Sequence, residues 1–211
     1  MHDHPHDHAH DPHAAQADHD AGPATAYEVL EAAVRDLLLS KGVLTANEIR
    51  AQIDLMDSRT PALGATVVAK AWTDPDFQTR LIETPRDAFA EAGVDIGSLA
   101  EFRVIANTDD VHNVVVCTLC SCYPKMLLGI PPAWYKSLAY RSRVVREPRA
   151  VLSEFGLKLP SDVQVRVHDS TADLRYLILP RRPDATDGWD ADKLASIVTR
   201  DCMIGTAVPT V

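Results

Sequence analysis

The sequence predicts an α+β fold: an N-terminal helical arm followed by a compact domain of small β-sheets covered by helices. Helix-capping signals with apolar residues at helical spacing dominate the first half, and β-branched runs appear from residue 102. Helices and strands do not alternate regularly, which favours α+β over a doubly wound sheet. With 211 residues and 46% hydrophobic content, the chain can bury one substantial core. We expect a tail at 1–24, an arm at 25–62 and a metal-binding catalytic domain at 63–211.

The tail, residues 1–24, is rich in His and Asp. It holds seven of the nine histidines and five aspartates, and it contains no Lys or Arg. Because it lacks apolar residues that could offset the entropy cost of ordering, we expect it to be disordered. Two functions stay open: a weak trap for divalent cobalt, nickel or zinc, or a solubilising tail with incidental metal affinity.

The arm contains two helix start signals. Thr25-x-x-Glu28 and Thr45-x-x-Glu48 are capping boxes, and Gly42 follows the first apolar run. They predict helices at 26–41 and 46–57. The apolar stripes of two such helices need cover from the domain or from a second polypeptide.

The domain is predicted to begin with helices and continue with strands. We expect helices at 63–72, from Asp74-Pro75, and from Thr84-Pro85 to about Gly93, since proline favours the first helical position. Strands are predicted at 102–108, 111–116, 163–169 and 174–180, and helices at 132–145, 147–155 and 190–200. The strand at 111–116 leads directly into a cysteine cluster, and a strand end is a rigid support for a site.

Three of the four cysteines lie in the run Cys117-Thr118-Leu119-Cys120-Ser121-Cys122, whose spacing can wrap one metal ion. The peptide nitrogens of Ser121 and Cys122 can complete chelate rings between the thiolates, while Cys117 reaches an axial position. Three sulfurs and two nitrogens leave one octahedral position for water or substrate. Deprotonating backbone amides requires a strongly Lewis-acidic ion, which favours Co(III) or Fe(III) over Zn(II).

Zinc and a disulfide are the alternatives for this cluster. A zinc knuckle would place a second Cys or His pair further along, but only His112, His168 and Cys202 remain outside the cluster and the tail. A disulfide would leave one thiol unpaired, and a Cys-x-Cys bridge is strained. We expect the two histidines to be packed or partly exposed side chains and Cys202 to be a buried hydrophobe.

The stretch VHNVVVCTLCSCYP (111–124) resembles the alpha subunit of nitrile hydratase and the gamma subunit of its relative thiocyanate hydrolase. The resemblance runs from about residue 27 to the C-terminus through LGIPPAWYK, YRSRVVREPR, RYLILPRRP, DGW and VTRDCMIG. It implies that Cys117, Cys120 and Cys122 bind the metal with the amides of Ser121 and Cys122. It also implies that Cys120 is a sulfinate and Cys122 a sulfenate. Thr118 resembles the cobalt branch, so the implied cofactor is non-corrin Co(III), with Fe(III) second.

The implied activity is that of a lyase that hydrates a small nitrile to its amide. Cys122 and Ser121 are the predicted catalytic residues, the Ser121 hydroxyl donating a hydrogen bond to water or substrate. The resemblance further implies a beta-type partner subunit, as one chain or two, and a metal-insertion activator protein. A metallochaperone that captures metal with the tail and transfers it through the thiolates is a non-enzymatic alternative, although an exchange-inert ion suits delivery poorly.

Two segments depart from the nitrile hydratase pattern. Pro124-Lys125-Met126 replaces the usual Pro-Trp-Pro, and residues 97–101 replace a Gln-Gly-Glu segment. A basic residue at Lys125 is similar to thiocyanate hydrolases, whereas the segments around Trp134 and 141–149 resemble cobalt nitrile hydratases. The substrate therefore stays open between a nitrile and thiocyanate.

Charge and hydropathy bear on the remaining partners. The net charge of −9 gives no reason to expect a nucleic acid, and no apolar run approaches the length of a membrane span. The polar N-terminus does not resemble a secretory signal, and clustered free thiols suit a reducing compartment, so we expect a cytoplasmic protein. The basic residues Arg141, Arg143, Arg146 and Arg149 form either a surface or a support for the oxidised sulfurs.

Overall fold

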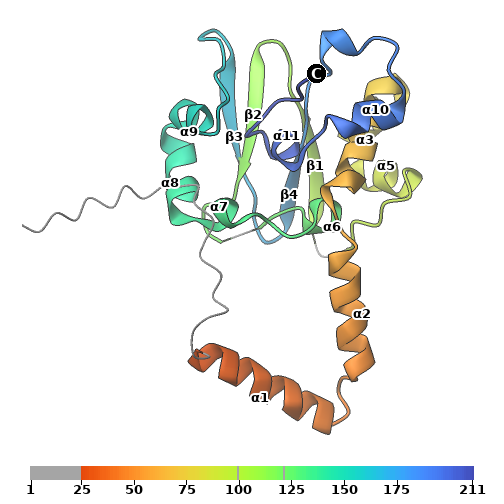
Figure 1. The fold of residues 1–211 in the computed structure, drawn as a ribbon, viewed down its shortest axis with the longest axis vertical. Helices are drawn as coiled ribbons and strands as arrows, with labels where there is room; N and C mark the ends of the chain where they lie inside the picture. Colours follow the sequence, from red (N-terminus) through yellow and green to blue (C-terminus); the bar gives the residue numbers. More distant parts are fainter. Residues whose placement is uncertain (1–24, 99, 121) are drawn as a thin grey trace, which may run out of the picture.

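The computed structural model describes residues 25–98, 100–120 and 122–211, and it confirms the α+β class (Figure 1). Two helices lead into a domain in which further helices surround two pairs of short strands. The predictions for the tail and for Ser121 lie outside the described residues. Among the residues described, no helix has the length and apolar character that crossing a membrane requires.

The arm consists of α1 (Ala26–Ser40) and α2 (Ala46–Asp57), and both predicted capping boxes are present. Neither helix contains a buried residue, and both project away from the domain (Figure 1). Several large apolar side chains are more than two-fifths exposed: Tyr27, Val29, Leu30, Val34, Leu37 and Ile53. The described part of the domain therefore does not cover the apolar stripes of the arm.

Three helices with proline at their first turn open the domain: α3 (Pro61–Thr73), which begins two residues before its predicted start, and α4 (Pro75–Glu83) and α5 (Pro85–Glu91), which begin at the predicted prolines. The first of them lies deep in the core, with Val67 and Val68 fully buried. Gly64 allows this close packing, because a Cβ atom there would lie 2.6 Å from Sδ of Met203. A glycine thus sets how near α3 approaches the C-terminal helix.

Four strands form two parallel pairs. β1 (Glu101–Ala106) pairs with β4 (Leu174–Leu179), and β2 (Val111–Val116) pairs with β3 (Gln164–Asp169). Contacts between β2 and β4 join the pairs at the centre of the domain (Figure 1). Because Val116 lies opposite Asp169, β2 and β3 end together at one edge.

Among the residues described after β2 there are six α-helices: α6 (Lys125–Leu128), α7 (Ala133–Lys136), α8 (Leu138–Arg146), α9 (Pro148–Glu154), α10 (Ala191–Ser196) and α11 (Arg200–Ile204). The prediction of one helix at 132–145 was wrong, because Ser137 has an extended ψ of 140° and its hydroxyl accepts a hydrogen bond from the Tyr140 N–H. The helix predicted at 190–200 is also divided, since α10 ends at Ser196 and Thr199 caps α11. The single turn of α6 was not predicted.

His112 and Asn113 form a buried polar network beside β1 and β3. The His112 Nε2 atom donates to the Gly205 carbonyl at 2.7 Å, and Nδ1 accepts from Asn107 Nδ2 at 3.3 Å. Asn113 Nδ2 donates to the Ala106 carbonyl, and Nε2 of His168 contacts Asn113 Oδ1 at 2.8 Å. Both histidines are packed side chains, as predicted, and the network connects strands from both pairs.

Burial of His112 makes the stability of the fold depend on pH. Only 4% of this side chain is exposed, and burial lowers its pKa below the usual value of about 6.5. As pH falls below 6.5, His112 becomes protonated in the unfolded chain but stays neutral in the folded chain. The free energy of unfolding therefore decreases. Between about pH 7.5 and 5.5 this site contributes up to about 1.4 kcal/mol of that loss. Urea unfolding at both pH values should show a smaller pH dependence for His112→Gln, and an unchanged dependence would contradict this role.

Candidate metal centre

The cysteine loop, residues 117–122, begins where β2 ends. The strand is buried along nearly its whole length, and it carries Cys117 into the interior with 1% of its surface exposed. Cys122 is 9% exposed, whereas Cys120 faces solvent. The loop is thus buried at both ends and open in the middle. Because Ser121 is outside the described residues, its predicted roles stay predictions.

The three thiols of the loop converge. The Sγ atom of Cys120 lies 3.3 Å from that of Cys117 and 3.1 Å from that of Cys122, and all three sulfurs lie within 4.8 Å of one another. These separations exceed a disulfide bond, and none of the four cysteines, all of which are among the described residues, forms a disulfide. At a metal–sulfur distance of about 2.3 Å, right-angled ligands lie about 3.3 Å apart and tetrahedral ligands about 3.8 Å. The three sulfurs are therefore close enough together to bind one thiophilic ion.

Side chains from three other elements hold the backbone of the cysteine loop. Arg141 on α8 donates from Nε to the Cys117 carbonyl at 3.0 Å and from Nη2 to the Thr118 carbonyl at 2.8 Å. Asp169, at the end of β3, accepts from the Thr118 N–H at 2.9 Å and from its hydroxyl at 2.5 Å. The Tyr135 hydroxyl on α7 donates to the Cys122 carbonyl at 2.9 Å. These bonds are made outside the thiol cluster.

The surroundings of Cys122 oppose ionisation of its thiol. Burial, followed by the hydrogen bond with Cys120, raises the pKa of the Cys122 thiol to about 12, and the charge of Arg175 on β4 acts in the opposite direction. A thiolate is the form that binds metal, so an ion entering this site must displace protons and supply the compensating positive charge.

Other candidate residues lie away from the sulfurs. The thiol of Cys202 is buried beside Thr199, at 3.1 Å from its hydroxyl, as expected for a small buried side chain. Arg143 pairs with Glu147 and Glu154. Arg146 donates to the backbone of its own helix, and Arg149 donates to carbonyls of residues 159–163. Of the four predicted basic residues, Arg141 reaches the cysteine loop, through carbonyl oxygens.

Sequence reasoning missed Asp169, Tyr135 and Arg175. The carboxylate of Asp169 was identifiable only once β3 was known to pair in parallel with β2, since parallel strands end at the same edge. Arg175 is a charged residue at the start of an otherwise apolar strand, which was an available signal. Tyr123, the residue after Cys122, is 3% exposed and packs its ring against that of Tyr135, with 5.0 Å between the ring centroids.

The family described as nitrile hydratase, alpha chain, matches residues 25–207. The chain is 47% identical over 194 residues to the thiocyanate hydrolase subunit gamma of Thiobacillus thioparus, covering 87% of this chain and 80% of that protein. It is 46% identical over 175 residues to the cobalt-containing nitrile hydratase subunit alpha of Pseudonocardia thermophila, covering 82% and 86%.

Solved structures agree with these relatives. A recombinant thiocyanate hydrolase with partially modified cobalt centres matches with a TM-score of 0.84 at 46% identity, covering 89% of this chain and 92% of that chain. A double mutant of the Fe-type nitrile hydratase from Comamonas testosteroni Ni1 matches with a TM-score of 0.83 at 39% identity and the same coverage. Fold, cysteine cluster and sequence therefore agree, and the chain belongs to the nitrile hydratase alpha-chain family.

Proposed function

We propose that this chain is the metal-carrying subunit of a nitrile hydratase, which adds water across a C≡N bond to give the amide at a non-corrin Co(III) centre. The observation that carries the proposal is the convergence of three thiol sulfurs within 4.8 Å at the end of β2. Cobalt-containing nitrile hydratase subunits at 46% and 47% identity support the choice of metal. The Fe-type structural relative makes Fe(III) the second choice.

In this proposal the sulfurs of Cys117, Cys120 and Cys122 hold the ion together with the amide nitrogens of Ser121 and Cys122. A bound trivalent ion would supply Lewis acidity to polarise the nitrile and to acidify water. Burial of Cys117 and Cys122 keeps solvent from the inner side, while exposed Cys120 marks the side from which substrate approaches. We assign Cys120 as a sulfinate and Cys122 as a sulfenate that accepts a proton, with the Ser121 hydroxyl donating to the substrate.

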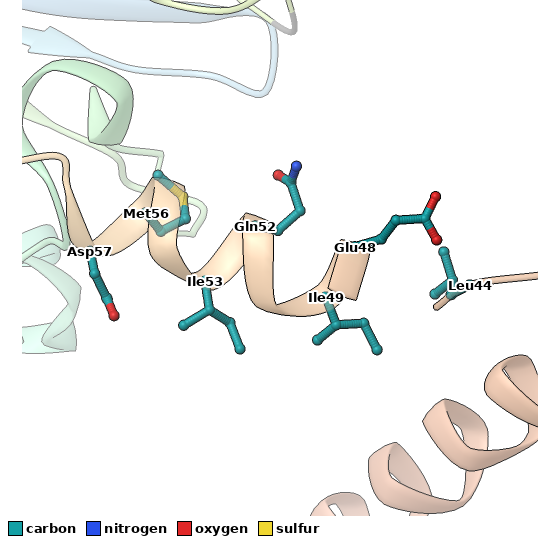
Figure 2. Close-up of a pocket in the computed structure, with 7 residues that line it drawn as sticks. All are labelled: Leu44, Glu48, Ile49, Gln52, Ile53, Met56 and Asp57. Atoms are coloured by element: carbon teal, nitrogen blue, oxygen red, sulfur yellow. The ribbon is translucent and has the colours of Figure 1, made fainter. Parts of the chain in front are cut away.

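The uncovered arm supports a beta-type partner subunit. Along α2, Leu44, Ile49, Ile53 and Met56 line an open apolar groove bordered by Glu48, Gln52 and Asp57 (Figure 2). A second groove lies between α1 and the start of α2 and is lined by Tyr27, Leu30, Val34 and Leu38 among others. Contiguous exposed apolar surface of this kind is typical of protein interfaces. We propose that the partner subunit packs on this surface, so that activity requires the assembled protein.

Replacement of Cys122 tests the metal centre. The natively assembled protein should contain about one cobalt per chain, and mass spectrometry should find oxygen added to the 117–122 peptide. Cys122→Ser should retain the fold by circular dichroism but lose turnover by at least about 100-fold, since loss of even an outer hydrogen-bond partner costs about 10- to 100-fold. The control Cys202→Ala, whose thiol lies beside Thr199, should keep its cobalt. Full turnover by Cys122→Ser, or tetrahedral zinc in the mature protein, would refute the assignment.

A charge on the arm tests the partner surface. Ile53→Asp places a carboxylate in the α2 groove and should weaken assembly with the partner by at least about tenfold, because burying an unpaired charge is costly. Ala51→Asp adds the same charge two residues away, towards the opposite face of α2, and should assemble normally. Size-exclusion chromatography of each variant co-expressed with the partner subunit measures the fraction that assembles. Equal assembly by the two variants would contradict the proposed surface.

Thiocyanate hydrolysis is the second candidate function, favoured by the 47% identity to a gamma subunit and by Lys125. This lysine is exposed at the start of α6, directly after the cysteine loop. The two segments that depart from the nitrile hydratase pattern also lie together, since a Cβ atom on Gly97 would be 3.9 Å from Cε of Met126. Both departures therefore alter one region of the surface.

Lys125→Met separates the two substrates. If thiocyanate is the substrate, losing this positive charge should raise KM for the anion several-fold at low ionic strength, because screening weakens exposed charges at high salt. KM for a neutral nitrile should change less than about twofold. Steady-state assays with thiocyanate and with a nitrile distinguish the two functions. If the protein turns over only nitriles, and Lys125→Met does not change that activity, thiocyanate hydrolysis is excluded.

A further inference from the structure

The backbone of the cysteine loop is held by partners that face away from its sulfurs. The Cys117 and Thr118 carbonyls accept from Arg141, and the Thr118 N–H donates to Asp169. The Cys120 N–H points back to Sγ of Cys117 at 3.3 Å. Each of these backbone groups thus has a hydrogen-bond partner, and the partners fix the conformation that gathers the thiols.

Arg141 suits this role because a guanidinium presents its donors in a rigid planar fork. Donation to two successive carbonyls turns both of them towards α8. The residue before it fixes α8 itself, since the hydroxyl of Tyr140, 2% exposed, donates to the Val115 carbonyl of β2 at 2.7 Å. The guanidinium is therefore anchored to the same strand that delivers Cys117.

Asp169 holds the same turn from β3. Its two carboxylate oxygens accept separately from the N–H and the hydroxyl of Thr118. The register that places Asp169 opposite Val116 puts this carboxylate within reach of a residue two positions further along. Thr118 is consequently held on its carbonyl by α8 and on its N–H and hydroxyl by β3.

We propose that Arg141 and Asp169 are positioning residues that hold the cysteine loop in the conformation that its metal ion needs. The inference rests on the proposed function only in requiring that the loop binds a thiophilic metal. Without these contacts the loop would have to order itself when the ion binds, and that entropy cost would be subtracted from the affinity. Partners outside the ligand shell typically contribute about 10- to 100-fold to metal affinity.

Cobalt binding to the full-length chain tests the proposal. The metal-free chain, kept reduced, is titrated with Co(II) while sulfur-to-cobalt charge-transfer absorption is recorded. Arg141→Gln and Asp169→Ala should each weaken binding by about 10- to 100-fold. Arg141→Lys should fall between wild type and Arg141→Gln, since an ammonium cannot span two carbonyls in the same fork.

Two matched controls separate this role from general effects of charge. Arg143 lies on the same helix as Arg141, and its guanidinium pairs with Glu147 and Glu154, so Arg143→Gln removes a similar charge without touching the cysteine loop. Asp162→Asn neutralises an exposed carboxylate just before β3. Both should bind Co(II) within about twofold of wild type, given the small effects of most surface charges.

Unfolding midpoints of the metal-free variants are measured alongside. If Arg141→Gln and Asp169→Ala lower the midpoint but bind cobalt as tightly as the controls, their role is structural and the inference is overturned. If the wild-type chain gives no sulfur-to-cobalt absorption, the inference and the proposed function both fail. If it binds Co(II) in the predicted order but the assembled protein hydrates no nitrile, the proposed function alone fails.

Discussion

The parallel register of β2 with β3 is the constraint on which the cysteine loop depends. It places Val116 opposite Asp169, so Cys117 and the carboxylate that holds Thr118 leave the sheet at the same edge. Antiparallel pairing would have put the start of β3 there instead. The parallel arrangement requires a long crossover between the strands, and that crossover contains α8, which supplies Arg141. One pairing therefore brings together the thiols, the carboxylate and the guanidinium.

Shape and charge are supplied to the loop by different groups. Burial raises the pKa of the Cys122 thiol to about 12, so the metal-free chain keeps it protonated. The loop geometry is held by hydrogen bonds to backbone atoms, which do not require the thiols to ionise. The positive charge that stabilises thiolates must come mainly from an ion. Hydrogen bonds therefore set the shape of the loop, and an ion that binds the Cys122 sulfur must displace its proton.

Features encoded locally were predictable from sequence, and those that depend on contacts distant in the chain were not. The capping boxes at Thr25 and Thr45 and the strand before Cys117 involve neighbouring residues, and each forms as predicted. The break at Ser137 was missed, because serine is tolerated inside a helix and becomes a cap here where α8 packs on β2 through Tyr140. The pairing of β2 with β3 joins residues about fifty positions apart, so neither its parallel register nor the role of Asp169 could be derived. The cysteine spacing predicted that the three thiols converge, but it did not predict that Arg141, Asp169 and Tyr135 bind the loop backbone.

The cysteine loop has its backbone partners within this chain, whereas several large apolar side chains of the arm stay exposed. The loop draws its backbone partners from α7, α8 and β3 of the same chain. The arm has no buried residue, and it extends from the end of the domain that carries α6 and α7 (Figure 1). Leu119, in the middle of the loop, is 87% exposed, and Ile130 and Leu138 nearby in sequence are also exposed. A subunit held by the arm would therefore lie against the open side of the cysteine loop. Such a subunit would exclude water around Cys120, the exposed thiol of the loop.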